Sequence, residues 1–321
     1  MNIRQLLHNP AVRSIGILSV LAITNSLFNR TIMTKFFFDY PVVILMLQMA
    51  TTLFAIEAAR MFNVVKLPAY TFQRGCHMFV PSLFYAISIY LCLECLDGIS
   101  MPVFPAIQRF LPVVIIAVGV YYKQRGFPSQ KTITIVILMC IAAFFSSLYE
   151  IAIEFWAIGY GIAALTMHGF ALVMIERLYE TSQSVLDLIY MNSFNCLCLF
   201  LVTDLIQDEI RDAFLYMLTS MTPLFLFCLA SLIVIGAAFH AAVFLCVAHA
   251  NAFHTAIIQN LCGALQIIVA YTLSVYLFYD IGPSTVNIIA VILTTISTYM
   301  FYRYGGLEDV VGKVKYGPVE A

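Results

Sequence analysis

Long runs of apolar residues alternate with short polar segments along nearly the whole chain. A run of about 18 or more apolar residues is long enough to cross a bilayer as a helix. The longest segment between such runs extends from Gln207 to Thr222. The pattern therefore predicts an all-α integral membrane protein with ten transmembrane helices, at about residues 13–32, 41–62, 78–96, 100–121, 132–149, 155–176, 184–206, 223–247, 254–278 and 284–303.

Basic residues are distributed unevenly between the two ends of these spans, which predicts an orientation because cytosolic loops are enriched in Lys and Arg. One end collects 12 of the 16 basic residues, and Arg109 lies inside a span. The remaining three are Arg30, Lys35 and Arg211. We expect both termini to be cytosolic, together with Arg4, Arg13, Arg60, Lys66, Arg74, Lys123, Arg125, Lys131, Arg177, Arg303, Lys313 and Lys315.

The number of spans suggests an internal repeat. Ten helices divide into two sets of five, and an odd number of helices per set makes the two sets inverted relative to one another. We expect one multi-pass domain over residues 1–321, with inverted repeats at about residues 13–149 and 155–303. No clear sequence identity between the halves supports the division, which depends on the count alone.

Composition excludes several classes of protein. Hydrophobic residues make up 62% of the chain and charged residues 10%, against about 25% charged in soluble domains. A net charge of −1 without a basic block argues against a nucleic-acid partner. The nine cysteines lack metal-ligand spacing, and we find no hydrolase, metalloprotease or P-loop motif. We therefore expect a membrane protein surrounded by lipid, with no enzymatic activity, cofactor or metal.

The segment from Ala248 to Phe278 is long enough to cross a bilayer but carries polar residues on one helical face. Thr255, Gln259, Gly263 and Gln266 have the spacing that places them there. Polar groups in hydrocarbon need a partner or a watery cavity. Two interpretations remain: the stripe lines a cavity, or it hydrogen-bonds to neighbouring helices.

The fourth span contains Gln108 and Arg109 among three prolines. A guanidinium at this depth is costly unless it faces protein or water, and its planar fork of donors suits phosphate or carboxylate. Arg109 is therefore a candidate anion-binding residue. The alternative is an internal ion pair with Glu94 or Glu57.

Other polar side chains lie in the first, sixth, seventh and eighth spans. Amides offer both donors and acceptors, so they suit a nucleobase or a sugar, but they suit contacts between helices equally well. Buried histidines serve as structural hydrogen-bonding groups or as proton relays. The residues concerned are Asn25, Asn29, His168, Tyr190, Asn192, Ser193, Asn195 and His240.

Five stretches occur in the same order as in a known family: NSLFNRTIMT, LMLQM, ARMFNVVKLP, SMPVFPAIQRF and NAFHTAII. Through them the chain resembles the nucleotide-sugar transporters of the drug/metabolite transporter superfamily, in particular the UDP-sugar branch. The resemblance covers about residues 25–304. It implies an inverted-repeat bundle in the Golgi or endoplasmic reticulum membrane that exchanges cytosolic nucleotide sugar for lumenal nucleoside monophosphate. It leaves open whether the transporter is a monomer or a homodimer.

The resemblance also assigns site residues. The family's Phe-Tyr-Asn-Asn motif falls on residues 190–193, where Asn192 matches strictly, and its Gly-x-x-Lys motif falls on residues 260–263, where Gly263 replaces the lysine. Our hypothesis is that Arg109 holds the diphosphate. The other expected substrate-binding residues are Asn29, Tyr190, Asn192, Ser193, Thr255, Gln259 and Gly263.

The absent lysine keeps two alternatives open. One is a carrier of sugar phosphates or other organic anions with the same superfamily fold. The other is a scaffold that binds a partner membrane protein and transports nothing.

Overall fold

The computed structural model describes the chain in six stretches, residues 9–99, 103–121, 128–147, 154–181, 184–273 and 284–303. Within them the regular structure is helical, and no strand occurs in these stretches. The helices are α2 (Pro10–Phe36), α3 (Pro41–Met61), α4 (Phe72–Gly98), α5 (Val103–Gln108), α6 (Leu111–Tyr121), α7 (Gln130–Ser147), α8 (Phe155–Glu180), α9 (Val185–Gln207), α10 (Glu209–Ser220), α11 (Pro223–Ala250), α12 (Ala252–Leu273) and α13 (Thr285–Phe301).

Eight helical segments in the described part of the chain are long and apolar enough to cross a membrane, with α5 and α6 together forming one of them. Their lengths of 18 to 28 residues match the roughly 20 residues that a bilayer requires. Two further apolar stretches, Gln130–Phe145 of α7 and Thr285–Phe301 of α13, are shorter. The prediction of a multi-pass helical membrane protein is therefore confirmed, and the arrangement of ten spans stays a prediction.

Local sequence explains where several spans begin. Helix α2 starts at Pro10 after Asn9, whose side chain accepts a hydrogen bond of 3.0 Å from the Ala11 N–H. Helix α11 starts at Pro223 after Thr222, which caps it in the same way. Proline is well suited to the first position because a helix leaves that N–H unbonded. These caps fix where the chain leaves its loops and enters the bundle.

The fourth predicted span is broken in two. Pro112 has no N–H to bond with the carbonyl four residues earlier, so the helix opens into a turn at Arg109 and Phe110, between α5 and α6. The Arg109 carbonyl also lacks its usual helical partner, because the Val113 N–H bonds to the Phe110 carbonyl instead. The Asn260 amide of α12 donates to this Arg109 carbonyl at 3.2 Å. The break is therefore held by a neighbouring helix.

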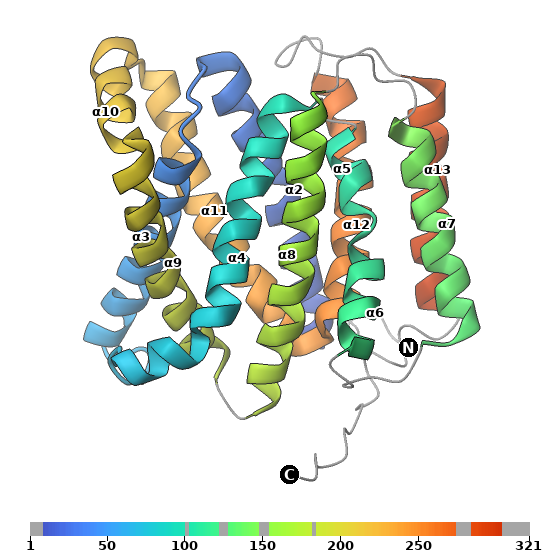
Figure 1. Ribbon diagram of the computed structural model, residues 1–321, viewed down its shortest axis with the longest axis horizontal. Helices are drawn as coiled ribbons and strands as arrows, with labels where there is room; N and C mark the ends of the chain where they lie inside the picture. Colours follow the sequence, from blue (N-terminus) through green and yellow to red (C-terminus); the bar gives the residue numbers. More distant parts are fainter. Residues whose placement is uncertain are drawn as a thin grey trace.

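The bundle is built from pairs of helices that are distant in sequence. Helix α4 packs on α8 and α9, α2 packs on α11, and α5 lies between α7 and α12. Figure 1 shows α7 and α13 together at one end of the bundle and α10 at the other. Large apolar side chains such as Phe155, Trp156, Leu205 and Ile206 remain at least 80% exposed, as expected for a surface that faces lipid.

The segment predicted as the longest loop contains a short helix, α10. Its first residue, Glu209, accepts a hydrogen bond of 2.9 Å from the Val42 N–H at the start of α3. The Tyr216 hydroxyl donates to the Phe36 carbonyl at the end of α2. Burial raises the pKa of Glu209 to about 7, although the backbone N–H contacts oppose the shift. Helix α10 therefore closes one end of the bundle over α2 and α3.

Candidate binding cavity

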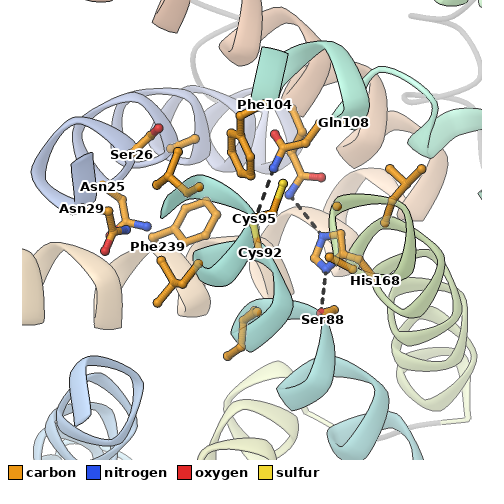
Figure 2. A pocket seen from close by; sticks show the side chains of 18 of the residues that line it. Asn25, Ser26, Asn29, Ser88, Cys92, Cys95, Phe104, Gln108, His168 and Phe239 are labelled. Atoms are coloured by element: carbon orange, nitrogen blue, oxygen red, sulfur yellow. Dashed lines mark hydrogen bonds between the residues drawn. The ribbon is translucent and has the colours of Figure 1, made fainter. Parts of the chain in front are cut away.

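A cavity lies inside the bundle, with an empty volume of about 1090 Å³ that includes space open to solvent. Its lining comes from α2, α3, α4, α5, α6, α8, α11 and α12. Figure 2 shows part of this lining, with Asn25 and Asn29 on one side and His168 and Ser88 on another. Helices from both halves of the chain therefore form one cavity.

The lining is polar in places but carries no formal charge. Among its residues in the described part of the chain there is no Lys, Arg, Asp or Glu. The hydrogen-bonding side chains that line the cavity are Asn25, Ser26, Asn29, Gln48, Tyr85, Ser88, Gln108, His168, His240, Gln259 and Gln266. Amides, hydroxyls and imidazoles can each donate and accept, so the cavity suits a ligand with many hydrogen-bonding groups.

His240 is held in a single orientation by two short hydrogen bonds. The Gln48 amide nitrogen donates to the Leu232 carbonyl, which turns the amide oxygen toward His240 Nε2 at 3.0 Å. Nε2 therefore carries the proton, and Nδ1 accepts from the Tyr85 hydroxyl at 2.8 Å. Both ring nitrogens have partners, so this part of the lining is a rigid connection between α3, α4 and α11.

His168 has the opposite tautomer and longer contacts. The Ser88 hydroxyl donates to the Tyr85 carbonyl at 2.7 Å, so its oxygen accepts from His168 Nδ1 at 3.4 Å. Nε2 then accepts from the Gln259 amide nitrogen, at 3.5 Å. The dashed lines of Figure 2 mark both contacts. Helices α4, α8 and α12 therefore meet at a weakly bonded imidazole.

Three amide oxygens of the lining have no hydrogen-bond partner in the described structure, those of Asn25, Asn29 and Gln266. The Gln266 nitrogen is engaged, since it donates to the Ala22 carbonyl at 3.0 Å. A buried acceptor without a donor is costly, and a ligand hydroxyl or N–H would supply one. The α2 side of the cavity therefore offers open acceptors to a ligand.

Two of the eight predicted site residues, Asn29 and Gln259, line this cavity. Gln266, which belongs to the same predicted stripe, also lines it, with Cys262 between them. Thr255 is fully buried at the start of α12 and donates to the Asn251 carbonyl at 2.7 Å. The polar stripe of α12 serves both interpretations, because Gln259 and Gln266 line the cavity and the Gln266 amide also donates to the Ala22 carbonyl of α2.

Gly263 allows two helices to approach closely. A methyl group at this position would lie 3.0 Å from the Pro105 side chain of α5, which is closer than ordinary van der Waals contact. Gly263 is absent from the residues that line the cavity. The position where the family has its lysine is therefore a packing contact between α5 and α12.

Arg109 is fully buried but does not line the cavity. Its three guanidinium nitrogens have no hydrogen-bond partner in the described structure. The ion pair considered for it does not form with Glu57, which instead pairs with Arg60 at 2.9 Å. Its neighbour Gln108 faces the cavity, since successive residues of a helix point about 100° apart.

The predicted residues of the seventh span lie on α9, outside the lining. The Tyr190 hydroxyl donates to Glu57 of α3. Asn192 and Ser193 are buried, at 2% and 3% exposed, and the Asn192 oxygen accepts a weak hydrogen bond from Cys196. Helix α9 packs against α3 and α4, so these side chains lie between helices. A binding role for them stays a prediction.

Several lining residues were not among the predicted set. Gln48, Tyr85 and Ser88 lie in apolar helices whose sequences give little sign of a cavity. His168 and His240 were noted only as histidines with two possible roles. The signal available in the sequence was a series of polar residues spaced along one helix face. Helices α3 and α4 carry few polar residues among many apolar neighbours, so the signal is weak there.

Fold and cavity together define a class, that of multi-pass helical membrane proteins with a polar internal cavity. No family model matches the chain. A curated relative from Arabidopsis thaliana, named UDP-galactose/UDP-glucose transporter 7, is 21% identical over 260 residues, which are 80% of this chain and 79% of the relative. A protein of Dictyostelium discoideum named as a candidate UDP-sugar transporter is 24% identical over 183 residues, which are 56% of this chain and 47% of that protein.

A solved crystal structure of a protein without a stated function has the same overall fold, with a TM-score of 0.57 and 11% identity over 89% of this chain and 96% of the other. The predicted resemblance to nucleotide-sugar transporters is confirmed by the two named relatives, at low identity. These relatives are transporters rather than enzymes, in agreement with the missing catalytic motifs.

Proposed function

We propose that this protein transports a UDP-sugar and binds it in the cavity between its helices. The observation that carries the proposal is a cavity rich in amides and hydroxyls at the centre of an apolar bundle. Both named relatives are described as UDP-sugar transporters, which supports the choice of substrate. A nucleotide sugar presents a base, a ribose, two phosphates and a hexose, so most of its surface requires neutral hydrogen-bonding partners.

Two sides of the cavity suit different parts of such a ligand. The free oxygens of Asn25 and Asn29 accept from sugar hydroxyls or from the N–H of a uracil ring. The rings of Phe104 and Phe239 also line the cavity and offer faces on which a base can stack. Sugar and base recognition are therefore assigned to α2, α5 and α11.

Helix contacts support the proposal of two inverted five-helix repeats, at about residues 13–149 and 155–303. If α2, α3, α4, α5 with α6, and α7 are matched in order with α8, α9, α11, α12 and α13, then the most extensive contacts between helices have counterparts. The α4–α8 contact matches α11–α2, α4–α9 matches α11–α3, and α6–α8 matches α12–α2. The α3–α9, α7–α13 and α5–α12 contacts join matched elements to each other. This is the pattern of a two-fold axis.

One pair of matched elements also shares a short sequence. Gln108 and Arg109 follow Ile107 at the end of α5, and Gln259 and Asn260 follow Ile258 in α12. Both glutamines line the cavity, while the Asn260 side chain reaches the Arg109 carbonyl. Inverted repeats around a site near the bilayer midplane commonly alternate access by moving one repeat against the other. We assign this mechanism to the protein.

The setting follows from the family. We propose a Golgi or endoplasmic reticulum membrane, both termini in the cytosol, and exchange of the UDP-sugar for a nucleoside monophosphate. The excess of basic residues at one end of the spans supports the orientation.

Counterflow uptake tests the proposal. Purified protein is reconstituted into vesicles preloaded with UMP, and labelled UDP-galactose or UDP-glucose is offered outside. We expect exchange that stops when UMP is omitted. Gln259→Leu, which removes an amide from the cavity lining, should lower the exchange rate at least tenfold, whereas Gln130→Leu at the exposed start of α7 should leave it unchanged.

The same vesicles separate the alternatives. Exchange of sugar phosphates without exchange of UDP-sugars would replace the proposal with an organic-anion carrier. Absence of uptake for every solute, by protein that remains folded and monodisperse, would refute transport and favour a scaffold.

A further inference from the structure

The diphosphate of the proposed ligand requires a positive charge that the resting cavity does not have. Two negative charges in a cavity of low dielectric constant need a nearby cation. The described lining contains no Lys or Arg, Gly263 packs against Pro105 where the family has its lysine, and Arg109 does not line the cavity. Within the described lining, a cation can come only from a residue that gains a proton.

The phenol and the thiols of the described lining ionise to a negative form, so neither kind of group can supply a cation. Imidazole is the side chain of the lining that becomes a cation when it gains a proton. The titratable groups that face the cavity are Tyr85, Cys92 and Cys95 on α4, His168 on α8, His240 on α11 and Cys262 on α12. The lining residues of α2, α3, α5 and α6 do not titrate.

The two histidines differ in their freedom to accept a proton. His240 is 6% exposed, and contacts of 2.8 and 3.0 Å engage both of its nitrogens. His168 is partly exposed, and its contacts of 3.4 and 3.5 Å are at the outer limit of hydrogen bonding. His168 is therefore the imidazole whose bonds a ligand can displace.

We propose that His168 is the phosphate-binding residue of the cavity and that it takes up a proton from solution together with the ligand. The inference rests on the proposed function. In the empty cavity Nε2 accepts from the Gln259 amide. Once Nε2 carries a proton, two donors face each other, and an oxygen of the diphosphate placed between them accepts from both. Nδ1 keeps its bond to Ser88 in either state.

The arrangement makes charge uptake conditional on the ligand. A buried imidazolium is stable beside an anion and costly without one. The proton therefore enters with the diphosphate and leaves when the nucleotide is released. A neutral nucleoside lacks the phosphates, so its binding should not involve the proton.

Titration calorimetry of the purified full-length protein with UDP-glucose tests the inference. Both phosphates of a UDP-sugar are esterified on each side and lack the ionisation near pH 6 of a phosphate monoester, so a proton taken up on binding belongs to the protein. Heats measured at pH 7.5 in two buffers of different ionisation enthalpy give the number of protons. We expect about one proton for UDP-glucose and none for uridine.

Variants locate the proton. His168→Gln should abolish proton uptake and weaken UDP-glucose binding about 10- to 100-fold at pH 6, as expected for loss of a charged hydrogen bond, while uridine binding stays within about twofold. His240→Gln should retain the uptake. His249→Gln, exposed on the same helix as His240, is the matched control and should behave as the wild type.

The outcomes separate the two proposals. UDP-glucose binding without proton uptake in wild-type protein would overturn the role of His168 and leave the transport function intact. Proton uptake that persists in His168→Gln would overturn it as well. Absence of UDP-sugar binding at every pH would overturn the proposed function and this inference together.

Discussion

Replacing Arg109 by methionine should stabilise the protein. The side chain is 0% exposed, and none of its three guanidinium nitrogens has a hydrogen-bond partner in the described structure. A buried ion without a partner costs several kcal/mol, even after the surroundings relax. Methionine keeps the apolar stem of the arginine and removes the charge. We expect the free energy of unfolding to rise by about 2 to 4 kcal/mol, at the lower end of that penalty.

Equilibrium unfolding in mixed micelles, followed by circular dichroism, measures this change. Arg74→Met is the matched control, because Arg74 forms an ion pair with Asp187 and donates to the Ala69 carbonyl at 2.9 Å. The control should destabilise the protein, so the two substitutions of the same type should have opposite signs. Destabilisation by Arg109→Met would refute the reasoning, since it would show that the guanidinium gains more from its surroundings than burial costs.

Exchange measured in the same variant tests the anion-binding role predicted for Arg109 from the sequence. Sites that carry out a function often retain groups that lower stability. A variant that is more stable but exchanges UDP-sugar much more slowly would support that role. A variant that is more stable and fully active would assign no transport role to Arg109.

Two further predictions concern the ends and the interior of the bundle. Burial raises the pKa of Glu209 from its ordinary value of 4.5 to about 7, so its contribution to stability is full below pH 4.5 and is lost as the pH rises through 7. Glu209→Gln keeps an acceptor for the Val42 N–H. Thermal unfolding should show that this variant loses less stability between pH 5.5 and pH 8 than the wild type does. An equal loss in both proteins would contradict the assignment. Gly236→Ala would place a methyl group on the Gln48 amide, so His240 loses its acceptor and unfolding in mixed micelles should show a loss of about 1–3 kcal/mol. Unchanged stability would show that Gln48 moves without cost.

The sequence predicted the membrane bundle well because the signals involved are local. An apolar run of sufficient length must satisfy its backbone hydrogen bonds internally, so it forms a helix wherever it lies in the chain. Caps such as Asn9 and Thr222 and the proline at position 112 act within one helical turn. The helices and their order follow from such signals. The break in the span expected at about residues 100–121 was not predicted, and neither was α10, with its weaker apolar character.

The site was predicted only in part because each side chain faces a direction that its neighbours decide. Gln108 and Arg109 are adjacent in sequence, yet one lines the cavity and the other is buried outside it. Asn29 and Asn192 are both amides in apolar helices, but α2 turns its amide to the cavity and α9 turns its own between helices. The sequence records that these residues are polar, and not which helix lies opposite them.

The sequence alone determined that this chain is a helical membrane protein that resembles nucleotide-sugar transporters, since hydrophobic length and ordered motifs are properties of contiguous segments. Only the tertiary structure decided that Gln48, Tyr85, Ser88, His168 and His240 share one uncharged cavity. These residues come from four helices separated by up to 192 positions in the chain. Their proximity depends on how the helices pack and rotate against one another, and that packing is a property of the whole bundle.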